Sequence, residues 1–195
     1  RWYFSSNSAV YLPSRYSVKA VTEGQRKFMG TFWNTYAFYI LYSNIDKFDA
    51  TKHSLDIDSL SIMDKWLLSK LNTTVKEVDN YLDNYKIIEV ARLLNDFVDD
   101  LSNWYVRRSR ERFWAKGLEQ DKINAYMTLY TTLLTLAKVS ASYIPYMTEE
   151  IYQNLVVAIH DEAKESIFLC DFPSYDENLI DKELEENMEA VLKLV

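Results

Sequence analysis

A run of arginines and tryptophans between positions 103 and 114 holds the residues of this chain that are best suited to chemistry. The planar guanidinium of arginine presents a fork of donors that matches phosphate oxygens, and it can also stack on nucleobases. A tryptophan ring nearby offers an unpaired base a flat surface on which to stack. These residue types predict a site for single-stranded or looped RNA. Its candidate residues are Asn103, Trp104, Arg107, Arg108, Arg110, Arg112 and Trp114.

Acidic residues in the same stretch support a second interpretation of the arginine run. Asp96, Asp99, Asp100 and Glu111 accompany the arginines, and ion pairs along a solvated helix face could use all of them. On charge spacing alone, this plain structural role is the more frequent one for such a pattern. Spacing cannot separate the two interpretations.

The arginine run must be positioned by a long helix. No Gly or Pro interrupts residues 86–116, which predicts a helix about 45 Å long at ~1.5 Å per residue. Steps of three and four residues place Arg107 and Arg110 side by side, with Trp114 one turn further on. Gly117 is expected to stop the helix, because it can adopt the left-handed conformation. An apolar stripe on another face consists of Leu94, Phe97, Val98, Leu101 and Tyr105.

Apolar residues at helical spacing also predict the elements that surround this helix. Further helices are expected at 18–44, at 59–84 with Asp58 or Ser59 as its cap, at 121–144, and from Thr148 onward. The segment 166–172 is strand-like, and 179–195 is an acidic amphipathic helix that is cut off. Only 3 Gly and 3 Pro occur, which argues against a fold with many tight turns. The predicted fold class is therefore all-α: an antiparallel helical bundle of about five helices, with a short strand-like segment and a truncated C-terminal helix appended.

Composition limits the kind of partner that the chain can bind. The formal net charge of its 195 residues is −7, whereas a general nucleic-acid-binding protein would be basic. Any RNA contact must therefore be a local basic patch on an acidic body. No apolar run approaches the roughly 18 residues of a membrane span, and no signal peptide is visible. The chain opens at Arg1 within sequence that looks structured, so we expect it to be a fragment of a longer protein.

The sequence offers no constellation for catalysis. His53 and His160 have no Cys or His at the spacing of metal ligands, so no metal site is expected. Cys170 is the single cysteine and lies in an apolar run, which favours a buried, inert thiol. A glycine-rich phosphate loop is also absent from the sequence. The chain is therefore interpreted as a helical module without catalytic residues of its own.

The central run then resembles a known family. Residues 100–110 read DLSNWYVRRSR, and this string is similar to the signature helix in the C-terminal region of isoleucyl-tRNA synthetases. The valine and leucine enzymes share the bundle but not this string. The resemblance covers nearly the whole chain. Its other matching segments are 25–28 (QRKF), 32–36 (FWNTY), 41–46 (LYSNID), 64–72 (DKWLLSKLN), 148–155 (TEEIYQNL) and 171–173 (DFP).

The resemblance implies an anticodon-binding domain of a class I aminoacyl-tRNA synthetase. It divides the chain into a connection from a catalytic domain at 1–17, the helical bundle at 18–162, and a small extension at 163–195 that leads to a further C-terminal region. The implied partners are the anticodon stem-loop of tRNA(Ile) and the catalytic domain of the same chain. The resemblance also implies a cytoplasmic protein without membrane contact, and we expect a monomer.

Catalysis would belong to the rest of the parent protein. The resemblance implies that the catalytic domain joins isoleucine to its tRNA with ATP and Mg, while this fragment holds no cofactor and should not catalyse the reaction. One alternative stays open. The chain could be an architectural bundle whose arginine helix docks the catalytic domain, with the RNA contacts elsewhere.

Overall fold

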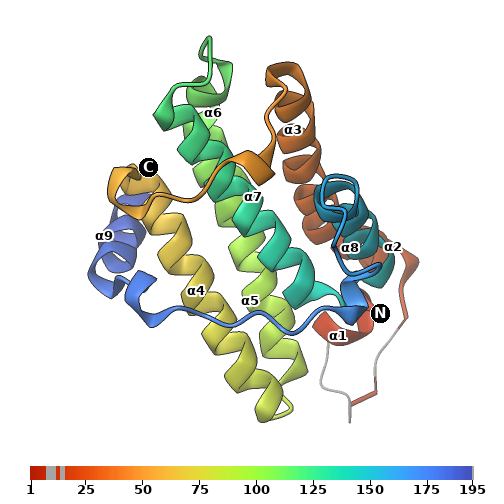
Figure 1. Cartoon of the computed structure of the whole chain (residues 1–195). Helices are drawn as coiled ribbons and strands as arrows, with labels where there is room; N and C mark the ends of the chain where they lie inside the picture. Colours follow the sequence, from red (N-terminus) through yellow and green to blue (C-terminus); the bar gives the residue numbers. More distant parts are fainter. Residues whose placement is uncertain (8–11, 14–15, 195) are drawn as a thin grey trace.

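The computed structural model describes residues 1–7, 12–13 and 16–194, and most of them are helical (Figure 1). No strand occurs in those ranges, so the all-α fold class is confirmed. The α-helices are α1 Trp2–Ser6, α2 Val18–Gly24, α3 Thr31–Asp46, α4 Ile62–Asp83, α5 Ile87–Asp100, α6 Arg107–Trp114, α7 Gln120–Ser140, α8 Pro145–Tyr152 and α9 Lys182–Leu192. The π-helical turns are η1 Gln25–Gly30, η4 Leu101–Val106 and η5 Gln153–Val157. Short 3-10 turns lie at Ala50–Lys52, Ile57–Ser59, Ile167–Leu169 and Glu177–Leu179.

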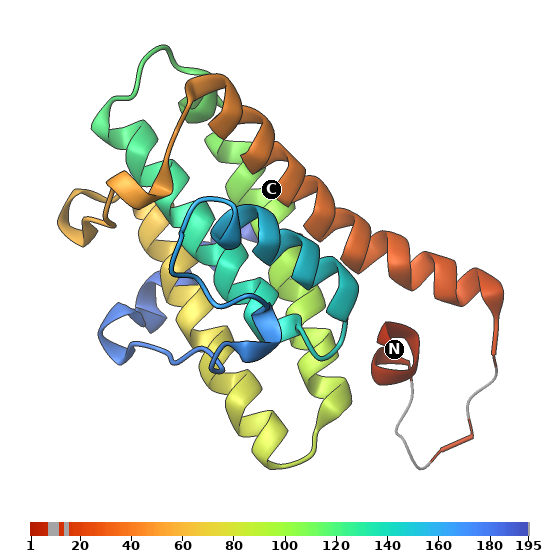
Figure 2. The ribbon, with the colours of Figure 1, turned by 45° about the vertical axis from the view of Figure 1, so that its right-hand side comes forward.

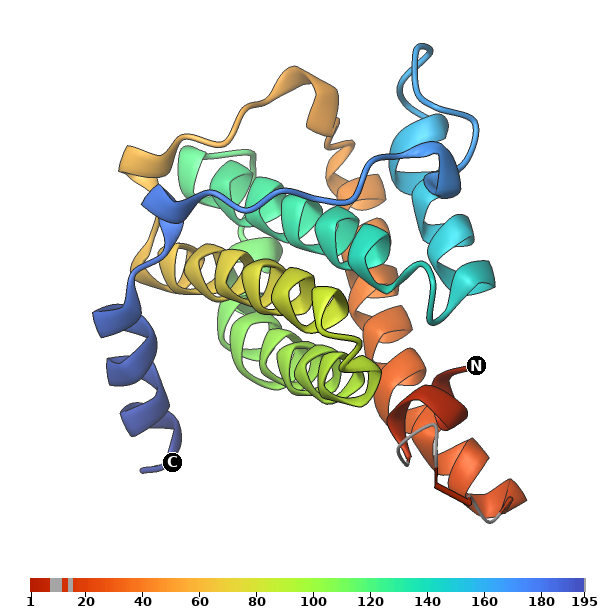
Figure 3. The same cartoon turned by 90° about the horizontal axis from the view of Figure 1, so that it is seen from below.

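The helices α4, α5 and α7 form the centre of the bundle. Helices α4 and α5 make an antiparallel hairpin, and α7 packs on α4 (Figure 1). Figure 2 shows α3 continuing through η1 and α2 as one long helix that extends beyond the bundle. Seen from below, α9 lies at one edge beside α4, and α1 and α2 lie at the opposite edge (Figure 3).

The predicted apolar stripe of the long helix is confirmed as core. Its five residues are all buried, and so is Phe113 further along. The helix is continuous from α5 through η4 to α6, although η4 is a π-helical turn. A π turn adds a residue to the turn and changes which side chains share a face, and such insertions are frequent at functional sites.

The connection predicted at 1–17 carries the short helix α1. Its Trp2 is buried, and the indole stacks on the ring of Phe28 with the centroids 3.7 Å apart. Residues 8–11 and 14–15 of that connection lie outside the described residues, as does Val195 at the end of the predicted C-terminal helix.

The strand predicted at 166–172 is wrong. Residues Ile167–Leu169 form a 3-10 turn, with Phe168 and Leu169 exposed. A lone apolar run has no neighbouring strand with which to pair its backbone, so other groups satisfy that backbone here. The carboxylate of Glu149 accepts hydrogen bonds from the backbone N–H of Ile167 at 3.1 Å and from the hydroxyl of Ser166 at 2.8 Å.

Two helix starts also differ from the prediction. Helix α4 is capped by Ser61, not by Asp58 or Ser59, in a capping box with Asp64. Helix α8 begins at Pro145, which is suited to the first helical position because it lacks an N–H that would go unpaired there. Within α8, Thr148 is buried, and its hydroxyl donates to a backbone carbonyl one turn earlier.

The predicted stop near Gly117 rests on backbone conformation, and it can be tested. Helix α6 ends at Trp114, and Gly117 in the connection has a φ of 79°. Gly117→Ala should therefore lower the free energy of unfolding by about 1 kcal/mol, because an L side chain is disfavoured in the left-handed region. Gly30 is the matched control, since its φ is −64° and a Cβ would meet nothing closer than 3.9 Å. Gly30→Ala should stabilise the helix by up to about 1 kcal/mol, and urea unfolding that gave both variants the same sign would contradict this account.

Candidate nucleic-acid interface

Helix α6 presents one side to the core and the other to solvent. Ser109 and Phe113 are buried, and the Phe113 ring contacts the rings of Phe38 and Tyr126 at centroid distances of 5.1 and 5.0 Å. Packing on this inner side fixes the rotation of α6 about its axis. The arginine side chains on its outer side are therefore displayed from a rigid element.

Three of the predicted arginines are on that outer side. Arg107, Arg108 and Arg110 are exposed. Among the described residues, no hydrogen bond or ion pair holds the guanidinium of Arg107 or Arg110. The guanidinium of Arg108 lies over the Trp104 ring, 4.5 Å from its centroid. This cation–π contact orients Arg108 without neutralising its charge.

The two tryptophans differ in what they offer a partner. Trp114 is 56% exposed, and its indole N–H donates to the hydroxyl of Tyr42 at 2.7 Å, which ties α6 to the end of α3. Trp104 is half-buried under Arg108, and its buried indole N–H has no hydrogen-bond partner among the described residues. Asn103 is exposed, and its amide donates to Asp99 at 2.6 Å. Of these two tryptophans, Trp114 is therefore the one with enough open ring surface for a base to stack on it.

Arg112 does not belong to this outer face. Its guanidinium donates to both oxygens of the fully buried Asp64 carboxylate, at 2.8 and 2.7 Å. A second set of hydrogen bonds joins it to the carboxylate of Asp121 at 2.8 Å. These contacts engage all three nitrogens of the guanidinium, so Arg112 ties α6 to the starts of α4 and α7, and its charge is already paired with two carboxylates.

Asp64 is the centre of this buried network. Its carboxylate also accepts from the hydroxyls of Tyr105 at 2.6 Å and Ser61 at 2.7 Å. Burial alone would raise the pKa of Asp64, but the hydrogen bonds from Arg112 and Tyr105 outweigh it and hold that pKa below its usual range. Burial raises the pKa of the Tyr105 hydroxyl, so that it stays a donor. The network thus holds one full ion pair inside the bundle.

A second ion pair fixes the neighbouring corner. The buried ammonium of Lys122 lies 2.5 Å from a carboxylate oxygen of Asp46, and it also donates to the carbonyl of Ala115 at 2.7 Å. The hydroxyl of Tyr126 donates to the same Asp46 carboxylate at 2.5 Å. The end of α3, the start of α7 and the connection after α6 are therefore held together beside Trp114.

Two of the four acidic residues considered as arginine partners have other partners in the structure. Asp100 pairs with Lys70, and Asp99 accepts from Asn103. The true partners of Arg112, at positions 64 and 121, are distant along the chain or in the next helix, so local spacing did not reveal them. One signal was present in the sequence, since Arg112 follows Tyr105 of the apolar stripe by seven residues and thus lies near the same face.

Other kinds of site find no support in the described part of the chain. No group of three or more His, Cys, Asp or Glu side chains there could hold a metal ion. None of the helices in the described ranges is long and apolar enough to cross a membrane. His53 stacks on Phe48 with the ring centroids 5.0 Å apart, so its ring packs in the connection after α3.

Comparisons of the sequence with known proteins identify its family. The model of a family described as "Anticodon-binding domain of tRNA ligase" matches residues 64–195. The chain is 53% identical over 195 residues to the isoleucine–tRNA ligase of Clostridium acetobutylicum, which covers 100% of this chain and 19% of that protein. It is 43% identical over 190 residues to the isoleucine–tRNA ligase of Bacteroides fragilis, which covers 97% of this chain and 17% of that protein.

A third relative gives the same result. The isoleucine–tRNA ligase of Dehalococcoides mccartyi is 44% identical over 194 residues, which is 100% of this chain and 19% of that protein. The chain thus spans about a fifth of the length of these curated relatives. A family model that matches most of the chain and relatives above 40% identity lead to one conclusion. The chain belongs to the family of anticodon-binding domains of tRNA ligases.

Proposed function

We propose that this chain holds the anticodon stem-loop of tRNA(Ile), so that a catalytic domain of the same polypeptide can attach isoleucine to the tRNA. The names of the relatives supply the amino acid, since each of those described is an isoleucine–tRNA ligase. In this proposal ATP and Mg act at the catalytic domain, and the polypeptide is a cytoplasmic monomer. The helical module positions RNA and takes no part in the bond-forming step.

One observation supports α6 as the element that contacts RNA. Arg107 and Arg110 are exposed, lie one turn apart and form no ion pair with the described residues. In a chain of net charge −7, neighbouring unpaired guanidinium groups form a local basic patch that attracts an anion. Phosphates of an RNA stem are such anions, and contacts to them fix position without reading sequence.

The neighbouring side chains suit an unpaired loop. An anticodon base is unstacked from any duplex, so an aromatic ring can receive its flat face. The exposed ring of Trp114 is next to the arginines, and its hydrogen bond to Tyr42 fixes the plane of the indole. Arg108, held over Trp104, adds a third positive charge to the same side. We therefore assign phosphate contacts to Arg107, Arg108 and Arg110 and a stacking contact to Trp114.

The architectural alternative accounts for part of the run only. Arg112 fits it, because its contacts to Asp64 and Asp121 join three helices of this module. Those contacts are internal, however, and pair the charge of Arg112 within the module. The exposed arginines form no ion pair with the described residues, so their partner lies outside this part of the chain. Binding of an isolated stem-loop, in the absence of a catalytic domain, separates RNA from a docked domain as that partner.

Salt dependence of binding tests the assignment. A labelled anticodon stem-loop of tRNA(Ile) should bind the chain with an affinity that falls steeply as salt rises, measured by fluorescence anisotropy. Arg107→Ala or Arg110→Ala should each flatten the log–log slope by about one unit, since each removes one phosphate contact. Trp114→Ala should weaken binding of the native loop by roughly tenfold and change the slope little.

Arg92→Ala is the matched control for these variants. Arg92 is also an exposed arginine on the same continuous helix, about 22 Å before Arg107 at ~1.5 Å per residue. The Arg92→Ala change should leave both the log–log salt slope and the affinity for the stem-loop unchanged. Equal effects of Arg92→Ala and Arg107→Ala on binding would refute the assignment of phosphate contacts to α6. The same holds if the folded chain does not bind the stem-loop at low salt.

A further inference from the structure

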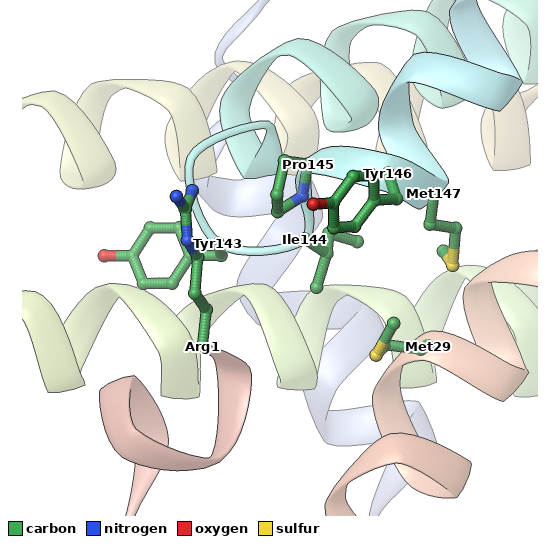
Figure 4. Close-up of a pocket in the computed structure, with 7 residues that line it drawn as sticks. All are labelled: Arg1, Met29, Tyr143, Ile144, Pro145, Tyr146 and Met147. Carbon is green, nitrogen blue, oxygen red and sulfur yellow. The ribbon is translucent and has the colours of Figure 1, made fainter.

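A groove lies near the N-terminal end of the long helix formed by α2, η1 and α3, between η1 and α8. This is the end away from Tyr42 and Trp114. It consists of two adjoining hollows of about 220 and 420 Å³, and Met29 and Met147 line both. Figure 4 shows Met147 reaching from α8 toward Met29 on η1, with Tyr143 and Arg1 further along. We call it the methionine groove. The larger hollow is completed by Thr22, Gln25, Arg26, Gly30, Trp33 and Asn34.

The methionine groove has a charge opposite to that of the whole chain. None of the described residues that line the two hollows is acidic, whereas Arg1 and Arg26 both line it. Arg26 is exposed and forms no ion pair with the described residues. The nearest acidic residue of that helix turn, Glu23, is already paired with Lys27 at 3.3 Å. The groove is therefore complementary to an anion.

The other lining groups suit a flat heteroaromatic ring. Trp33 is 39% exposed, and its ring is available at the wall of the hollow. The side-chain amides of Gln25 and Asn34 are exposed and form no hydrogen bond with the described residues, so each can offer a donor and an acceptor to a base edge. Methionine side chains adapt their shape to a ring and contact its face favourably. A volume of about 420 Å³ lies within the range of small-molecule sites.

The long helix links this groove to the outer side of α6 that carries Arg107, Arg108 and Arg110, which we call the arginine face. Arg26 and Trp33 lie on the helix whose other end carries Tyr42, the partner of Trp114. Arg26 and Tyr42 are sixteen residues apart, which is about 24 Å at ~1.5 Å per residue. A loop held at α6 would not reach that far, but another part of the same RNA could.

We propose that the methionine groove receives an unpaired nucleotide of the bound tRNA, outside its anticodon stem-loop. The base stacks on Trp33, the amides of Gln25 and Asn34 meet its edge, and Arg26 pairs with the adjoining phosphate. That the RNA is a tRNA rests on the proposed function of the chain. The base-binding chemistry of the groove does not.

A short single strand tests the groove independently of α6. The probe is a labelled six-nucleotide oligoadenylate. In this experiment every residue of α6 to which we assign an RNA contact is changed to Ala: Arg107, Arg108, Arg110 and Trp114. Trp33→Leu should weaken binding about tenfold, whereas Trp33→Phe, which keeps a ring, should stay within about threefold. Arg26→Ala should flatten the log–log salt slope by about one unit. Circular dichroism checks that each variant is folded.

Three results would overturn the proposal. The first is oligoadenylate binding that Trp33→Leu and Arg26→Ala leave unchanged, and the second is no binding of oligoadenylate at low salt. The third is competition by a hexaglutamate peptide as strong as that by unlabelled oligoadenylate, which would show that the groove recognises negative charge alone. A second titration separates the two proposals. With the arginine face intact, Trp33→Leu should weaken whole tRNA(Ile) about tenfold and leave the isolated stem-loop unaffected. If the stem-loop fails to bind but oligoadenylate binds through Trp33, the function proposed for α6 fails and the groove stands.

Discussion

Arg112→Ala should lower the free energy of unfolding by about 3–5 kcal/mol, the largest loss we expect from any arginine of this chain. The variant leaves Asp64 fully buried without the guanidinium that donates to both its oxygens. Tyr105 and Ser61 would still donate to the carboxylate, but neither carries a positive charge. A buried charge that has lost its counter-ion is destabilising by far more than a lost surface ion pair.

Urea unfolding followed by circular dichroism measures this loss. Arg110→Ala is the matched control, since it removes an exposed arginine two positions away that makes no ion pair with the described residues. It should change the free energy of unfolding by no more than about 0.5 kcal/mol. Asp64→Asn combined with Arg112→Ala should cost less than the sum of the two single changes, because the two groups interact directly. Full additivity would mean that the ion pair does not stabilise the fold.

The pH dependence of the same pair has a definite sign. Hydrogen bonds from Arg112 and Tyr105 outweigh burial and hold the pKa of Asp64 below its usual range. Because the folded pKa is the lower one, the stabilisation from this carboxylate is complete above the unfolded value of about 3.9. It is lost as the pH falls through the folded pKa. The difference in stability between the native chain and Arg112→Ala should therefore shrink below about pH 4, and a difference that grew there would contradict the assignment.

The sequence predicts the bundle well because its helices are long and strongly patterned. The stripe that includes Leu94 and Tyr105 is buried as its spacing indicates, and Gly117 is left-handed as its type suggests. Periodicity fails where an element has no partner. The apolar run at 166–172 has the composition of a strand, but only the fold reveals that none of the described residues forms a second strand beside it.

The candidate site also contains residues whose place the sequence predicts and residues whose place only the fold reveals. The exposure of Arg107 and Arg110 follows from helical spacing, because that spacing turns them away from the apolar stripe. The exposure of Arg108 does not, since it follows Tyr105 of the stripe by three residues, and the π-helical turn η4 changes which side chains share a face there. Nor does the role of Arg112, since Asp64 is 48 residues away and reaches it only through the packing of α4 on α5 and η4. Nor does local pattern reveal the methionine groove, whose walls come from segments more than a hundred residues apart.

Arg107→Glu combined with Arg110→Glu should weaken binding of the anticodon stem-loop by roughly 100-fold at low salt. Each change removes a phosphate contact and places a negative charge in its stead, and like charges facing each other at an interface cost several kcal/mol. The loss should shrink as salt rises, because the repulsion between exposed charges is screened. Fluorescence anisotropy at several salt concentrations measures both effects.

The control must change the net charge by the same amount. Arg92→Glu combined with Lys193→Glu reverses two other exposed cations, neither of which has an ion pair among the described residues. If the RNA meets α6, this second variant should lose less than about threefold, since its changes act only through the long-range field of the chain. Equal losses in the two variants would mean that the stem-loop senses net charge alone. A large loss confined to Arg107 and Arg110 would instead locate the phosphates within hydrogen-bonding reach of those two side chains, because only short-range contacts distinguish variants of identical charge.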